Sequence, residues 1–249
     1  MIKPDLIVCQ PSHVDYPLFR YNLKRFRRYF ENVYITLTQD SITPDLRPFL
    51  IETMQDVTFV RPPEAADRPD WRDRAVREVL INFSKSEWVL FMEQDFLIKD
   101  ASFFEKVLNT QEHDAVLYME GPRIHPAFAL VRRAVVGRTS MDFAANPPKY
   151  DHFGLFFKQL ADSCTWMELE DARLVEKDDF YHLAGLTQNY YCFLNNQPLF
   201  KPKEFLTYNH YAIRLPIVHN TSFRELGKRI DASYEYDLTY IRDFFPYDL

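Results

Sequence analysis

The protein has 249 residues, a length that fits one large domain or two small ones. Its formal net charge of −6 argues against a protein that binds nucleic acid or anionic membranes by charge alone. Only five glycines are present, and neither a GxGxxG nor a GxxxxGK[ST] phosphate loop occurs. The three cysteines include no CxxC pair, which argues against a disulfide framework and a cysteine zinc site.

The hydrophobic runs are short throughout the chain. The first one, residues 6–9, is too short for the apolar core of a signal peptide. No run reaches the roughly 18 apolar residues of a membrane helix. We therefore expect a cytoplasmic protein without a membrane span.

Strands and helices alternate in the first hundred residues. Apolar runs rich in β-branched residues predict strands at 6–9, 33–38, 57–60 and 88–92. Apolar residues at three- and four-residue steps predict helices at 16–30, 46–54 and 73–83. This alternation predicts a mainly parallel central sheet flanked by helices, with ligands beyond the carboxyl ends of its strands.

The second half is less regular. Its patterns predict helices at 101–108 and 153–163, a loop at 139–149 and a helical tail from residue 222. They also predict short strands, some of them in an antiparallel part, at 115–119, 127–131, 166–169 and 180–183.

The most informative segment is the apolar strand 88–92, which is followed at once by Glu93 and Asp95. Carboxylates at the end of a strand can hold Mg²⁺ or Mn²⁺, and such an ion neutralises the charge of a departing diphosphate. An isolated ExD pair more often begins a solvated loop. The apolar strand and the alternation before it favour the metal site here.

With these features, residues 5–190 resemble the GT-A fold nucleotide-sugar glycosyltransferases, particularly the family 2 type. Glu93-Gln94-Asp95 is similar to the DxD motif of that family, with Glu in place of the first Asp. The resemblance implies one α/β glycosyltransferase domain over residues 1–249. Residues 1–100 would be its nucleotide-binding half, and 101–249 its acceptor-binding half with the tail.

The resemblance also implies a donor and a cofactor. The donor would be a nucleotide-diphosphate sugar, with a UDP-sugar favoured, and the cofactor Mn²⁺ or Mg²⁺ held by Glu93, Asp95 and His182. His182 precedes Gly185 and Thr187, as the family's metal histidine does, although a hydrogen-bonded core histidine is the alternative. His210 and His219 compete for the same role. The implied donor-binding residues are Pro11, Ser12, His13, Gln39, Asp40, Arg74, Arg77 and Gln94.

A general base is implied at the start of the helix 153–163. In inverting members of the family an acid at this place removes the proton of the acceptor hydroxyl, and here it would be Asp151. Aspartate is also a good helix N-cap, so Asp151 has a structural alternative. The competing candidates are Asp142, Glu170 and Asp171.

The acceptor is the least determined part of the prediction. We expect a glycan or polysaccharide precursor, with a modified nucleic-acid base less favoured. Five basic residues between positions 20 and 28 fit either a solvated surface or an anionic acceptor. Two other functions compete: a nucleotidyltransferase, whose glycine-rich N-terminal loop is missing, and a non-catalytic carbohydrate-binding protein, which the many aromatic residues would suit.

Overall fold

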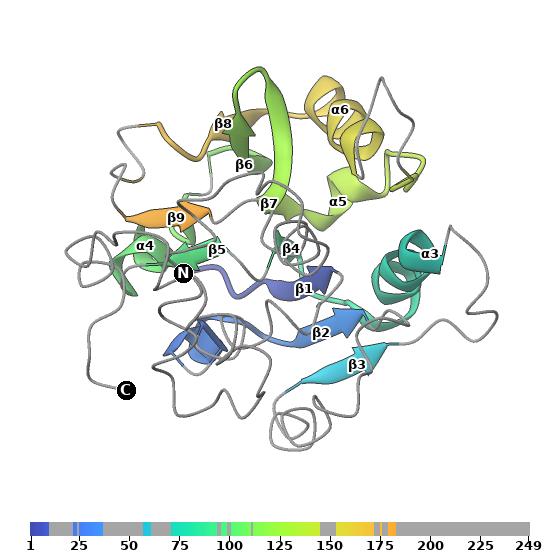
Figure 1. The fold of residues 1–249 in the computed structure, drawn as a ribbon, viewed down its shortest axis with the longest axis horizontal. Coiled ribbons are helices and arrows are strands. Elements are labelled where there is room, and N and C mark those ends of the chain that lie inside the picture. The colour runs from blue at the N-terminus through green and yellow to red at the C-terminus, as the bar shows by residue number, and fades with distance from the viewer. Residues whose placement is uncertain are drawn as a thin grey trace, which may run out of the picture.

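A seven-stranded sheet with strand order β3-β2-β1-β4-β7-β6-β8 forms the centre of the protein (Figure 1). The computed structural model describes residues 1–9, 22–23, 25–36, 57–60, 71–93, 96–98, 101–110, 112–144, 153–171, 175 and 179–182. The strands of the sheet are β1 (Asp5–Cys9), β2 (Val33–Thr36), β3 (Thr58–Val60), β4 (Trp88–Met92), β6 (Ala115–Glu120), β7 (Arg123–Arg132) and β8 (Trp166–Glu168). A separate antiparallel pair consists of β5 (Phe96–Ile98) and β9 (Phe180–His182).

The strand order reverses between β1 and β4. Strands β3, β2, β1 and β4 are mutually parallel, β7 runs antiparallel to β4 and β6, and β8 is parallel to β6. The chain therefore builds outward from β1 to β3 and returns to the other side of β1 for β4. This confirms the predicted mixed α/β class, and a reversal of this kind is where open α/β sheets bind ligands.

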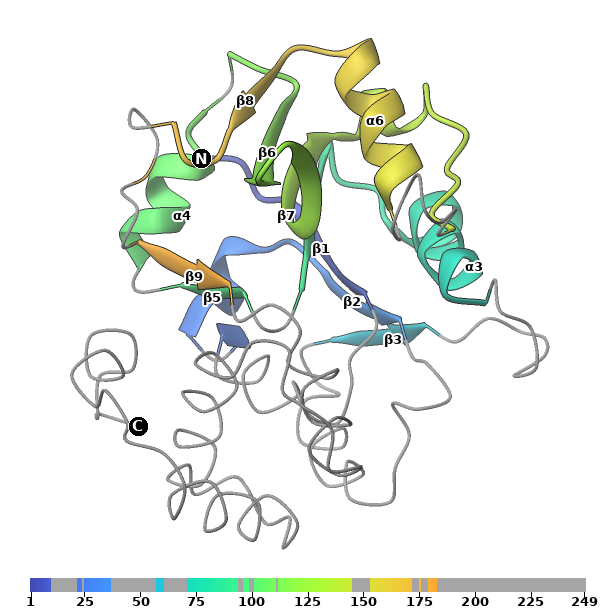
Figure 2. The same cartoon turned by 45° about the horizontal axis from the view of Figure 1, so that its top comes forward.

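Helices cover both faces of the sheet. On one face Phe103 and Phe104 of α4 (Ala101–Val107) belong to the same buried hydrophobic cluster as Leu90 of β4. On the other, α3 (Trp71–Glu78), α5 (Arg133–Val136) and α6 (Gly154–Ser163) surround Phe91. Both views show α4 on the opposite side from α3 and α6 (Figures 1 and 2). Strand β4 is buried on both faces, which explains its unbroken apolar run.

The helices differ in detail from the expectation. The predicted helix 73–83 is α3 followed by the π-helical turn η4 (Val79–Phe83), closed by the Ser84 amide donating to the Val79 carbonyl over 2.7 Å. The predicted helix 16–30 is described only near its end, which closes with a 3₁₀ turn, η1 (Arg27–Tyr29). The predicted helix 46–54 and the tail from residue 222 lie outside the described residues.

No helix within the described ranges is both long and apolar enough to cross a membrane.

Arg25 and Arg28, in the predicted basic segment, contact neighbouring aromatic rings, and Arg25 also contacts a backbone carbonyl. Arg25 Nη1 donates to the Ile98 carbonyl over 3.0 Å, and its guanidinium lies 4.7 Å from the ring centre of Phe26. Arg28 lies in the same way over Tyr29, at 5.0 Å. These contacts favour the interpretation in which the basic stems cover aromatic residues.

A bulge separates two sections of the β6–β7 ladder. Leu117 pairs with Ala129 and Met119 with Ile124, so residues 125–128 of β7 oppose the single residue Tyr118. Pro126 lies in this bulge, a place where a residue without an amide proton costs no ladder hydrogen bond. β7 therefore begins four residues before the predicted strand 127–131. Bulges often redirect a side chain next to an active site.

Candidate metal centre

Glu93 directly follows β4 at the reversal of the strand order. Its amide donates to the Ala127 carbonyl over 3.1 Å, and its carbonyl accepts from the Phe96 amide over 3.4 Å. These two bonds fix the backbone of Glu93 between β7 and β5. Its side chain is 32% exposed.

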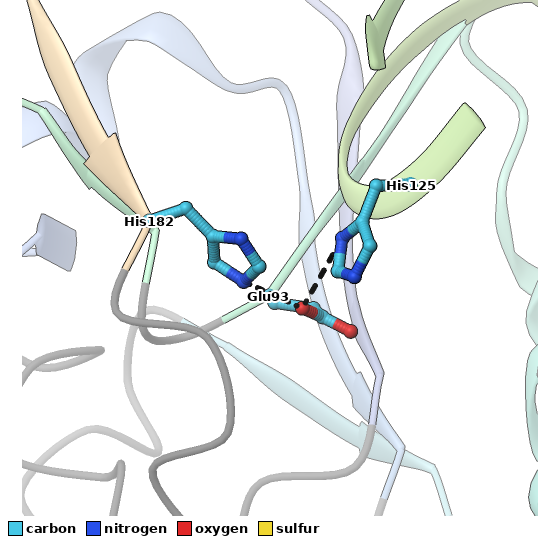
Figure 3. A group of neighbouring side chains, drawn as sticks. All are labelled: Glu93, His125 and His182. Carbon is cyan, nitrogen blue, oxygen red and sulfur yellow. Dashed lines mark ion pairs between the residues drawn. The ribbon is translucent and has the colours of Figure 1, made fainter. Parts of the chain in front are cut away.

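His182, at the end of β9, contacts this carboxylate. In the β5–β9 pair His182 lies opposite Phe96. Phe96 is only three residues after Glu93 in the sequence, so the pairing brings His182 near Glu93. His182 Nε2 lies 3.3 Å from Glu93 Oε2, and the imidazole is only 3% exposed (Figure 3). Phe96 stacks on Phe180, the first residue of β9, with ring centroids 4.9 Å apart, which holds β9 against β5. The structure thus brings together two of the three predicted metal ligands.

His125 is a third member of the cluster, and the sequence did not predict it. Its Nδ1 lies 3.9 Å from Glu93 Oε2, and one ligand atom from each of Glu93, His125 and His182 lies within 4.8 Å of the other two. The Tyr118 ring meets both imidazoles edge-on, with centroids 6.0 Å from His125 and 5.8 Å from His182. The signal that could have found His125 is Pro126, because a proline inside a strand pattern marks a bulge.

The protonation states suit a cation. Burial raises the pKa of Glu93, but the hydrogen bond and charge of His182, together with His125, hold it below its usual value. Burial lowers the pKa of His125 and outweighs the opposing effect of Glu93. Because the charge of His182 is among these causes, a bound cation would replace that charge beside the Glu93 carboxylate, while the lowered pKa of His125 favours the neutral imidazole that binds a metal.

The spacing also fits a divalent cation. Ligand atoms about 2.0–2.2 Å from an ion are themselves roughly 3–3.5 Å apart. The 3.3 Å contact of Glu93 with His182 lies in this range, and the 3.9 Å contact with His125 is wider, so His125 would have to move closer to bind the same ion. One carboxylate with two imidazoles suits transition ions better than Mg²⁺, which prefers oxygen.

Other predicted site residues lie elsewhere in the described structure. Arg77 on α3 donates through Nη2 to the Met141 carbonyl over 2.7 Å, and Arg74 lies one turn earlier on the same helix. In both views α3 is on the far side of the sheet from the β5–β9 pair (Figures 1 and 2). The structure therefore does not group either arginine with Glu93.

The candidates for the base are partly described. The N-cap of α6 is Phe153. Asp142 Oδ1 accepts from the Ala144 amide over 3.2 Å. Glu170 and Asp171 lie in the turn after β8, where the Asp171 amide donates to the Glu168 carbonyl. The site predictions outside the described residues are Pro11, Ser12, His13, Gln39, Asp40, Gln94, Asp95, Asp151, His210 and His219.

Comparison with known proteins returns structures of the type that the sequence resembles. The mannosyltransferase PcManGT from Pyrobaculum calidifontis, solved with GDP-Man and Mn²⁺, is similar over 98% of this chain and 84% of its own, with 13% identity and a TM-score of 0.48. A putative nucleotide-diphospho-sugar transferase from Desulfovibrio desulfuricans is similar over 98% and 99%, with 11% identity and a TM-score of 0.49. Residues 1–349 of TarS from S. aureus are similar over 93% of this chain and 79% of their own, with 14% identity and a TM-score of 0.49.

No protein-family model matches the sequence, and no curated protein has significant similarity to it. At identities of 11–14% and TM-scores below 0.5 these similarities assign no activity to the chain.

Proposed function

We propose that the protein is a glycosyltransferase that moves a sugar from a nucleotide-diphosphate sugar to an acceptor hydroxyl. One observation carries the proposal: the Glu93 carboxylate lies at the β1–β4 reversal and is contacted by His182 from a distant part of the chain. The same two residues were singled out from the sequence for the donor's metal site.

In this proposal Glu93 and His182 hold a divalent cation, with Asp95 as a further ligand. The bound ion supplies positive charge that stabilises the departing diphosphate. Glu93 suits this place because its backbone is fixed by β7 and β5 and its side chain is in contact with His182. The low exposure of His182 keeps water from competing on that side of the carboxylate.

The remaining assignments extend the proposal to the donor and the acceptor. Gln94 and the loops after β1 and β2 would contact the donor, for which we favour a UDP-sugar. Asp151 would accept the proton of the attacking hydroxyl, with inversion at the anomeric carbon. We propose a glycan or polysaccharide precursor as the acceptor, and the cytoplasm as the place of action.

The two competing functions make different demands on the chain. A nucleotidyltransferase on a similar sheet would use a glycine-rich N-terminal loop, whereas the first glycine here is Gly121. A non-catalytic carbohydrate-binding protein would bind glycan equally well after its metal ligands were removed.

The test is release of the nucleoside diphosphate from a panel of nucleotide sugars in the presence of Mn²⁺. We expect the native protein to hydrolyse one donor slowly without an acceptor. His182→Ala should lower that rate by about a hundredfold or more, because the charge that stabilises the leaving group is lost. His113→Ala is the matched control, since His113 precedes β6 and is not in the Glu93 cluster. Failure to turn over any donor, or full activity of His182→Ala, would refute the proposal.

A further inference from the structure

A second imidazole faces the Glu93 carboxylate, and the proposed donor site does not use it. His125 and His182 lie on either side of the carboxylate in Figure 3, with ring centroids 4.7 Å apart. His125 comes from the bulge in β7, and its side chain is 13% exposed. A polar ring that is nearly buried beside a carboxylate needs a defined set of partners.

Hydrogen bonds determine which nitrogen of His125 carries the proton. The Ala127 amide donates to Nδ1 over 3.1 Å, so Nδ1 holds a lone pair and the proton is on Nε2. Nδ1 itself lies 3.9 Å from Glu93 Oε2, although its lone pair is taken by the Ala127 amide. This tautomer is the one that can bind a cation through Nδ1 without first losing a proton.

A carboxylate lies at the other end of the same ring. His125 Nε2 is 3.5 Å from Glu120 Oε2, and Arg123 Nη2 donates to that same oxygen over 2.8 Å. Arg123, Glu120 and His125 therefore form a chain that ends at the Glu93 carboxylate. Histidines that bind metals commonly donate their other ring N–H to a carboxylate, which fixes both the tautomer and the ring orientation.

We propose that His125 binds the cation through Nδ1 as a third protein ligand beside Glu93 and His182, with Glu120 as the positioning residue for its ring. The inference rests on the cation site of the proposed function. The cation takes the place of the Ala127 amide proton at Nδ1, because that nitrogen has one lone pair. Two imidazoles and one carboxylate then make a site selective for Mn²⁺, Co²⁺ or Zn²⁺ over Mg²⁺.

The direct test counts imidazole nitrogens around bound Mn²⁺. The full chain is freed of metal with a chelator, loaded with Mn²⁺ and examined by pulsed electron paramagnetic resonance, which detects coupled ¹⁴N nuclei. We expect two coupled imidazoles in the native protein and in His113→Ala, and one in His125→Ala. If His125→Ala does not fold, His125→Gln fills the same space without an imidazole and gives the same readout.

Calorimetric titration provides a second readout that does not depend on catalysis. His125→Ala should weaken Mn²⁺ binding by about tenfold or more while changing Mg²⁺ binding by less than about threefold. Glu120→Gln should keep both coupled nitrogens and weaken Mn²⁺ binding by about tenfold, as loss of an orienting carboxylate does.

The outcomes separate this inference from the proposed function. Two coupled nitrogens without turnover of any nucleotide sugar would support His125 as a ligand and refute the glycosyltransferase. Turnover of a nucleotide sugar with only one coupled nitrogen in the native protein would support the glycosyltransferase and refute His125 as a ligand. An unchanged nitrogen count in His125→Ala, or no Mn²⁺ binding by the native protein, would overturn the inference.

Discussion

Replacing Asp5 should destabilise the protein without altering the metal centre. Asp5 is fully buried at the start of β1, and its carboxylate connects that strand to the segment just before β4. Five hydrogen bonds end on its two oxygens. They come from Asn32 Nδ2 (2.9 Å), Ser84 Oγ (2.7 Å), Lys85 N (3.0 Å), Ser86 N (3.2 Å) and Ser86 Oγ (2.9 Å).

The size of the effect follows from these donors. A hydrogen bond to a charged group contributes roughly 1.5–3 kcal/mol, and buried donors without an acceptor cost about 1–3 kcal/mol each. Because such contributions are not additive, Asp5→Ala should lower the free energy of unfolding by about 3–5 kcal/mol. Asp5→Asn keeps the shape and one acceptor oxygen, so its cost should be about 2 kcal/mol. Urea unfolding followed by tryptophan fluorescence measures both.

The pH dependence has a defined sign. Burial raises the pKa of Asp5, but its hydrogen bonds with Asn32, Ser84 and Ser86 outweigh burial and hold the pKa below the usual 3.8. A depressed pKa stabilises the folded protein above the unfolded value, and this contribution is lost as pH falls through the folded-state pKa. The difference between native protein and Asp5→Asn should therefore be constant above about pH 5 and shrink below pH 3.8. A difference that grows on acidification would refute this reasoning, as would native stability in Asp5→Ala.

Three further predictions concern the site, the core and a thiol. Asp95→Asn should abolish Mn²⁺-dependent turnover of a nucleotide sugar while leaving the circular dichroism spectrum and unfolding curve unchanged; undiminished turnover would reject Asp95 as a ligand. Phe91→Ala should lower the free energy of unfolding by about 3–5 kcal/mol, since Phe91 is 1% exposed in the sheet core. Its control Phe83→Ala, at a ring 42% exposed, should cost about 1 kcal/mol or less; equal costs would contradict the packing argument. Burial and Asp114 raise the pKa of Cys164 to about 11, so iodoacetamide at about pH 8 should alkylate it roughly a hundredfold more slowly than a free cysteine. Mass spectrometry of a time course measures that rate, and reaction at the free-cysteine rate would contradict burial of the thiol.

The sequence predicted the parallel part of the fold because its strands are buried on both faces. An apolar run such as 88–92 has few alternatives to a central strand, and alternation with helices then requires parallel connections. The three-residue strand β5 was missed because it directly follows Glu93-Gln94-Asp95 and is too short to show a period. Its pairing with β9 depends on a contact between distant segments, which no local pattern contains.

The sequence predicted some residues of the candidate site, such as Glu93, and missed His125. Glu93 could be identified because a carboxylate at the end of a buried strand has a recognisable local context. Pro126 marks a bulge next to His125, but the approach of His125 to Glu93 depends on how β7 pairs with β4, which no local pattern contains. Only the pairing of Met92 with Phe128 shows that residues before Phe128 extend past the end of β4 toward Glu93.

The most direct test of the central claim is whether a cation at Glu93 holds the diphosphate of a donor. Pulsed electron–nuclear double resonance on Mn²⁺-loaded protein with a nucleotide sugar detects ³¹P nuclei coupled to the ion. The account predicts ³¹P coupling in the native protein and its loss in Glu93→Gln. Bound Mn²⁺ without ³¹P coupling, or coupling that persists in Glu93→Gln, would contradict it.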